Sequence, residues 1–157
     1  MPIGMAVDLS WIENAEIKEV GEFKKGWYRV LCSKVSPPVD EKGGQVAIPF
    51  QFKIQSEEGG YKDEMVFHRL RAPGGSAADV DQGKLRLWRK DLKGFLAAFY
   101  PKGVDLAKAD LDKCEGVQVY AFLEAGQEYQ GERRPQVVPG RWATKLPEGS
   151  TEGPQSA

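Results

Sequence analysis

Cations and aromatic rings alternate along several stretches of this 157-residue chain. Residues two apart on a β-strand point to the same side, so this alternation would gather rings and charges on one face. A ring can stack on a nucleic-acid base while Lys or Arg neutralises the phosphate, and each stacked base contributes about 1–3 kcal/mol. The candidate residues are Trp27, Arg29, Lys53, Phe67, Arg69, Arg71, Tyr120, Phe122, Tyr129, Arg133, Arg134, Arg141 and Trp142. For any single ring, packing in the core is the competing interpretation.

The sequence has no recognisable catalytic or metal-binding motif. Its Gly43-Gly44 and Gly74-Gly75 pairs lack the lysine and the helix start that follow in a phosphate-binding loop. His68 is the only histidine, and Cys32 and Cys114 are far apart, so a structural zinc site would lack ligands. We therefore expect no cofactor and no metal. An enzyme with a deep polar pocket is the weakest functional alternative.

The overall charge provides no general attraction for nucleic acid. The chain carries 22 Lys and Arg against 23 Asp and Glu, a formal net charge of −1. Phosphate binding would therefore need a local basic face. A predicted helix offers one in Lys84, Arg86, Arg89, Lys90 and Lys93, which would otherwise only keep that helix soluble. The N-terminus lacks a basic start and no segment has about 20 successive apolar residues, so we expect a cytoplasmic protein without membrane contact.

Three segments in the first half of the chain have the composition and period of β-strands. They cover residues 26–36, 46–55 and 62–71, with Gly-containing turns at 39–45 and 57–60. In the second segment apolar residues occupy alternate positions and place Phe50 and Phe52 in the core. Pro49 cannot donate a ladder hydrogen bond, so we expect it at an edge or a bulge. Periodicity does not decide which face of the third segment is buried.

Residues 85–99 change to the period of a helix. Its apolar stripe, which includes Trp88, is expected to face the core and consists of Leu85, Leu87, Trp88, Leu92, Phe95, Leu96 and Phe99. A short helix at 105–113, a strand at 117–124, a polar hairpin loop at 125–134 and a last strand at 135–143 follow. The tail from Leu146 is rich in Pro, Gly, Ser and Glu, and we expect it to be disordered.

The resulting order of elements, β-β-β-α-β-β, predicts a mainly β (α+β) domain. Its plan is a five-stranded antiparallel OB-type barrel with an amphipathic helix between strands three and four. The domain would span residues 21–145, between an N-terminal arm at 1–20 and the disordered tail at 146–157. A mixed α+β sheet of another topology is the structural alternative.

Short motifs resemble those of phage-encoded single-stranded DNA-binding proteins with an OB-fold. They are Gly26/Tyr28 in the first strand, Gly60/Tyr61/Val66/Phe67 around the third, and Leu111/Gly116/Val119 before and within the fourth. The similarity extends from about residue 20 to 142. Many such proteins end in an acidic tail that recruits partners. This tail carries only Glu148 and Glu152, which speaks against that mode of recruitment.

The resemblance implies a protein that coats single-stranded DNA during phage replication or recombination. Together with the rings and cations, it predicts sequence-tolerant binding of single-stranded DNA, with RNA left open. Replication or recombination proteins and further copies of the chain are candidate partners. The near-zero net charge motivates one main rival: a non-catalytic protein-interaction or assembly module of the same fold.

Overall fold

The computed structural model describes residues 23–41, 45–73, 80–106, 109–129 and 132–155, with the side chains of 127–129 and 132–133 outside this description. The predicted arm at 1–20 and the Gly43-Gly44 turn also lie outside it. The helical elements are η2 (Glu58–Gly60), α2 (Gln82–Phe99) and η4 (Leu111–Cys114). The strands are β1 (Gly26–Val35), β2 (Val39–Glu41), β3 (Gln45–Ile54), β4 (Met65–Pro73), β5 (Gln118–Tyr129), β6 (Glu132–Ala143) and β7 (Gly153–Pro154).

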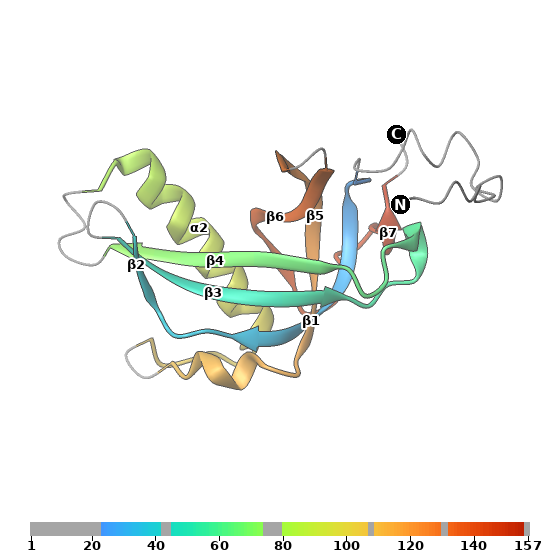
Figure 1. Ribbon diagram of the computed structural model, residues 1–157. Helices are drawn as coiled ribbons and strands as arrows, with labels where there is room; N and C mark the ends of the chain where they lie inside the picture. Colours follow the sequence, from blue (N-terminus) through green and yellow to red (C-terminus); the bar gives the residue numbers. More distant parts are fainter. Residues whose placement is uncertain (1–22, 42–44, 74–79, 107–108, 130–131, 156–157) are drawn as a thin grey trace, which may run out of the picture.

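These strands form one antiparallel sheet with β1 and β3 near its centre (Figure 1). The order is β2-β3-β1-β5-β6, while β4 pairs with β3 and β7 pairs with β1. β3 and β4 form a long ribbon, paired from Gln45 with Pro73 to Lys53 with Met65. Within the described residues no pairing joins β4 to β6, so the sheet is open. The mainly β class with one long helix is confirmed, but these pairings do not make a closed five-stranded barrel.

The core lies between the inward face of this sheet and α2. Phe50 and Phe52 of β3 are 1% and 0% exposed, which confirms the prediction from their period. Phe95 of α2 packs against them, with its ring centroid 4.9 Å from that of Phe50. Packing also decides the orientation of β4, because Val66 is 0% exposed whereas the adjacent Phe67 is 53% exposed.

Pro49 faces a gap along one edge of β3, as its missing N–H requires. β1 pairs with β3 only up to Phe50, and β2 resumes the pairing at Ala47. The Pro49 carbonyl accepts a hydrogen bond from the Ser36 backbone N–H at 2.9 Å, so this side of the residue faces the bend between β1 and β2. The prediction for Pro49 is confirmed. The predicted turn at 39–45 is shorter than expected because residues 39–41 form β2.

Helix α2 follows the predicted boundaries closely, but not the whole predicted apolar stripe. Leu85 and Phe95 are buried, as expected. Leu87 and Leu92 are 48% and 36% exposed, and Trp88 is only half-buried, so the prediction is wrong at these three positions. No helix in the described part of the chain is long and apolar enough to cross a membrane.

The second half of α2 makes the close contact with β6. A Cβ atom on Gly94 would clash with the carbonyl group of Gly140, whose own φ is +81°. The buried carboxylate of Asp91 accepts hydrogen bonds from the Trp142 Nε1–H at 2.9 Å and the Gly140 N–H at 3.1 Å. It also lies 2.6 Å from Nε2 of His68 on β4. Because the contact is centred here, Leu87 and Trp88 in the first half of α2 remain partly exposed.

Three further predictions are corrected by the structure. The expected helix at 105–113 is reduced, in its described part, to the single turn η4. The expected loop at 125–134 is mostly strand, since β5 and β6 continue their pairing to Tyr129 with Glu132. The expected disordered tail instead returns to the sheet as β7, where the Gln155 N–H donates to the Lys25 carbonyl at 2.8 Å. The hairpin and the returning tail share a cause: both depend on pairing between strands, which the composition of the segment does not show.

Candidate nucleic-acid interface

One group of predicted site residues lies on the open outer side of β3 and β4. We call Lys53, Phe67, Arg69 and Arg71 the β4 face. Phe67, Arg69 and Arg71 alternate with buried residues and are all exposed; the two arginine side chains are 51% and 43% exposed. Lys53 points to the same side from β3, because its strand neighbour Gln51 is paired with Phe67. The structure therefore brings one exposed ring and three cations together.

Glu41 of β2 partly neutralises the β4 face. Its carboxylate accepts hydrogen bonds from Arg69 Nη1 at 2.6 Å and from Arg71 Nε at 3.0 Å. The hydrogen bond from Arg71 is the largest effect that lowers the pKa of Glu41 below its ordinary value of 4.5, so the carboxylate is ionised at neutral pH. Ion pairs this exposed contribute only about 0–1 kcal/mol each. A phosphate could therefore take the place of Glu41 at modest cost.

A second group lies on the outer side of β1, β5 and β6, but its rings are covered. Trp27 and Phe122 are 8% and 6% exposed and meet edge to face, with ring centroids 5.6 Å apart. The guanidinium carbon of Arg141 lies 4.0 Å from the Phe122 centroid and 5.3 Å from that of Trp27. The expectation that these two rings stand open for base stacking is corrected, because both rings are buried and Arg141 lies over them.

Tyr120 and Arg29 of this second group lie beside a carboxylate of the C-terminal segment. The Tyr120 hydroxyl donates a hydrogen bond to Glu152 Oε1 at 3.2 Å. Burial raises the pKa of Tyr120, and the negative charge of Glu152 raises it further. Arg29 is paired with Tyr120 across β1 and β5, and its Nε is buried without a hydrogen-bond partner among the described residues. The side chains of Arg29 and Tyr120 are therefore less exposed to solvent than Phe67, Arg69 and Arg71 of the β4 face.

The remaining predicted residues are divided between the core and the end of the β5–β6 hairpin. Trp142 is 6% exposed and belongs to the core, which corrects its assignment to an open face. Arg134 is exposed on β6. Tyr129 and Arg133 lie on the paired strands, but their side chains are outside the described part of the structure.

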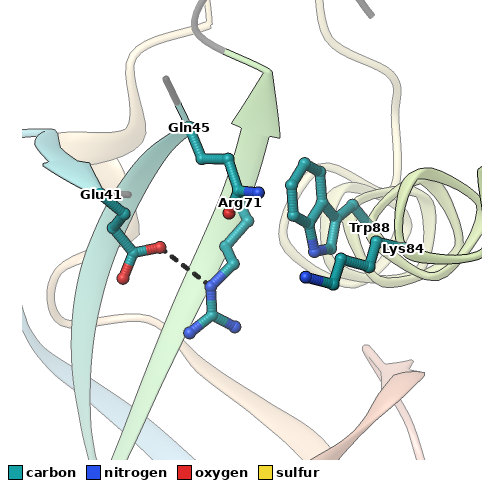
Figure 2. Close-up of a pocket in the computed structure, with 5 residues that line it drawn as sticks. All are labelled: Glu41, Gln45, Arg71, Lys84 and Trp88. Atoms are coloured by element: carbon teal, nitrogen blue, oxygen red, sulfur yellow. Dashed lines mark hydrogen bonds and ion pairs between the residues drawn. The ribbon is translucent and has the colours of Figure 1, made fainter. Parts of the chain in front are cut away.

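A pocket joins the β4 face to α2, and Figure 2 shows it. The Trp88 pocket is an open hollow of about 480 Å³ lined by Glu41, Gln45, Arg71, Lys84 and Trp88. In Figure 2 the side chains of Lys84 and Trp88 project from the helix toward Arg71 and Gln45 on the ribbon. Arg71 belongs to both the β4 face and the pocket, so the two features are continuous.

Sequence reasoning placed Trp88 in the core and left the role of Lys84 open. Their spacing held a usable signal, because residues at i and i+4 lie on the same face of a helix. That signal indicates only that a cation and an indole are neighbours. Neither Glu41 nor Gln45 carried a comparable signal, since their place opposite α2 depends on how the β3–β4 ribbon packs.

The comparisons with known proteins do not assign a family. No protein-family model and no curated protein matches this chain. What the chain does must therefore be inferred from its own residues and their arrangement.

Proposed function

We propose that this chain is a non-enzymatic, sequence-tolerant single-stranded DNA-binding protein that supports phage DNA replication or recombination in the host cytoplasm. The observation that carries the proposal is Phe67, a phenyl ring 53% exposed between cations on an open sheet face. An exposed phenyl ring gains hydrophobic free energy when a ligand or a partner covers it. Together with Arg69 and Arg71 it has the combination that stacks a base and neutralises its phosphates.

The connectivity of the strands supports an OB-type arrangement for this proposal. β1, β3 and β4 are the first three long strands, α2 follows β4, and β1 lies between β3 and β5. OB-folds are partly open five-stranded barrels that bind oligonucleotides on the face of their second and third strands. Those strands correspond here to β3 and β4, which carry the β4 face.

The interaction energies favour release of Arg69 and Arg71 from Glu41 when single-stranded DNA binds. The exposed pairs of Glu41 with Arg69 and Arg71 contribute about 0–1 kcal/mol each, whereas one stacked base contributes about 1–3 kcal/mol. Each phosphate that replaces the carboxylate also releases condensed counterions. Binding should therefore be strongest at low salt despite the net charge of −1.

The test is a titration of the full chain with fluorescently labelled oligo-dT at two salt concentrations, with oligo-rU of equal length in parallel. We expect binding that weakens as salt rises, and a loss of about 5- to 100-fold in affinity for Phe67→Ala. Phe67→Leu should lose nearly as much, because leucine is apolar but has no ring to stack. The proposal would be contradicted if the unmodified protein did not bind oligo-dT at low salt. It would also be contradicted if the unmodified protein, Phe67→Ala and Phe67→Leu bound oligo-dT with equal affinity.

A protein-interaction module is the second candidate, and one observation favours it. Val39 on β2 is 41% exposed and Phe67 is 53% exposed, so the outer side of this part of the sheet offers apolar as well as basic surface. Capture of a protein through apolar contacts would depend little on ionic strength. Self-association that is insensitive to salt, without oligonucleotide binding, would favour this candidate.

A further inference from the structure

We propose that the Trp88 pocket holds one nucleotide of the bound strand, with the base on the Trp88 indole and its phosphate between Arg71 and Lys84. The inference rests on the proposed function and extends it to a second contact point, at the Arg71 end of the β4 face. It adds α2 to an interface that would otherwise involve only the sheet.

The position of Trp88 differs from that of the other described tryptophans. Trp27 and Trp142 are 8% and 6% exposed and both meet other rings. Trp88 is half-buried, and within the described residues no aromatic side chain contacts it. Its indole faces the pocket in Figure 2. It is therefore the described tryptophan that can accept a base without disturbing the core.

The charge of the pocket favours an anion. Its lining combines Arg71 and Lys84 with a single carboxylate, Glu41. Arg71 uses its Nε–H for Glu41, which leaves the other N–H groups of the guanidinium for a further acceptor. The ammonium group of Lys84 is exposed and forms no ion pair with a described residue. A phosphate between Arg71 and Lys84 would balance this excess of positive charge.

Gln45 provides polar contact without demanding one particular base. Its side chain carries both a hydrogen-bond acceptor and two donors, so it can match different base edges by rotating the amide. The hollow of about 480 Å³ is within the range of small-molecule sites, and it is open to solvent on one side, so a bound nucleotide can remain joined to a longer chain. These properties suit a nucleotide within a longer strand.

The pocket and the exposed ring of the β4 face lie along one path. Phe67 and Arg71 are four residues apart on β4, or about 13 Å at the rise of a strand. A DNA strand with one base stacked on Phe67 and its backbone beside Arg69 would therefore reach the pocket at Arg71. This continuity predicts that the two contact points act on the same oligonucleotide.

The experiment is an oligo-dT titration at low salt with the variants Trp88→Leu, Trp88→Phe and Lys84→Ala. We expect Trp88→Leu to weaken binding about 5- to 100-fold, whereas Trp88→Phe should retain most of the affinity. A base stacked on Trp88 should also quench the tryptophan fluorescence of the unmodified protein, and Trp88→Phe should lose part of that quenching. Lys84→Ala should weaken binding and reduce the slope of log K against log salt by about 0.7. Lys93→Ala is the matched control, since it removes an exposed lysine from the opposite side of the same helix and should bind as the unmodified chain does.

The outcomes separate this inference from the proposed function. If the unmodified chain does not bind oligo-dT, the proposed function fails and the inference fails with it. If Phe67→Ala is weakened but Trp88→Leu and Lys84→Ala bind normally, the proposed function stands and the pocket is not a contact point. If only Lys84→Ala is weakened, the pocket holds a phosphate without a stacked base, and the inference as stated is wrong. Unchanged urea denaturation of each variant establishes that a loss of binding is not a loss of folding.

Discussion

Glu41 controls the charge of the proposed interface, because its carboxylate binds both Arg69 and Arg71. Its carboxylate binds Arg69 and Arg71 while also lining the Trp88 pocket. In the free protein it offsets two positive charges that would otherwise repel each other. In the proposed complex it would compete with phosphate for the same N–H groups.

Replacing Glu41 with Gln should therefore tighten oligonucleotide binding. The glutamine keeps the size of the side chain but removes the negative charge, and loss of two exposed pairs worth about 0–1 kcal/mol each corresponds to a gain of up to about 30-fold in affinity. Titration with oligo-dT at low salt measures this gain. Asp40→Asn is the matched control, because Asp40 is an exposed acid on the same strand. Weaker binding by Glu41→Gln would mean that phosphates do not replace this carboxylate.

At the scale of elements, Asp91 holds α2 against two strands. Burial disfavours its charge, but hydrogen bonds from His68 and Trp142 outweigh this effect and hold the pKa of Asp91 below its ordinary value of 3.8. A carboxyl group whose pKa is lower in the folded state adds stability above its unfolded pKa. That contribution is lost as the pH falls toward the folded pKa.

Asp91→Asn should lower the free energy of unfolding by about 2–4 kcal/mol at neutral pH. The amide nitrogen replaces the carboxylate oxygen that faces His68 Nε2, so this contact keeps a hydrogen bond only if the imidazole changes tautomer, and the substitution removes the charge that faces His68. Urea denaturation measures the loss. The variant should also lose less stability than the unmodified chain between pH 5 and pH 3, because the titrating carboxyl group is gone. Parallel stability curves over this range would contradict the role given to Asp91.

The contact between Gly94 and Gly140 sets the distance between α2 and β6. Alanine favours a helix over glycine by about 1 kcal/mol, so Gly94→Ala would stabilise an isolated helix. Here the added Cβ would meet the backbone of Gly140, and such overpacking costs about 1–3 kcal/mol. We expect Gly94→Ala to destabilise the protein in thermal denaturation. Gly83→Ala in the first turn, where the Cβ would meet only the Asp81 carboxylate at 3.3 Å, should not.

At the scale of the whole molecule, the C-terminal segment (residues 147–155) covers the edge of β1 at Gly26. β7 pairs with Gly26, and a Cβ atom at Gly26 would clash with the Gly153 carbonyl. Glu152 in the same segment forms a bridge with Trp27 and accepts the Tyr120 hydrogen bond. The segment therefore adds a strand at the edge of β1 and places a carboxylate beside Tyr120, whereas the β4 face lies on other strands and is open.

A chain that ends at Leu146 should be less stable and should expose Trp27. We expect the free energy of unfolding to fall by about 1–3 kcal/mol, with a red shift of tryptophan emission as water reaches the indole. Urea denaturation and emission spectra measure the two effects. A chain that ends at Gln155 keeps every described contact of β7 and is the control. An unchanged emission spectrum after the longer truncation would show that this segment does not cover Trp27.

The sequence by itself determined the local elements of this protein. Period-two alternation located β3 and its buried Phe50 and Phe52, the change to a helical period located α2, and the missing N–H of Pro49 required a gap in pairing. Each of these follows from the geometry of a few successive residues, which the chain carries in its own order.

Only the tertiary structure decided which aromatic residues are accessible. Trp27 with Arg29 and Phe67 with Arg69 have the same alternation, yet the first ring is covered and the second is open. One cause of the difference is Arg141, which lies over the Trp27 ring and is more than 100 residues from it along the chain. The Trp88 pocket likewise forms where α2 meets the β3–β4 ribbon. Contacts between distant segments depend on how the elements pack, and no local pattern encodes them.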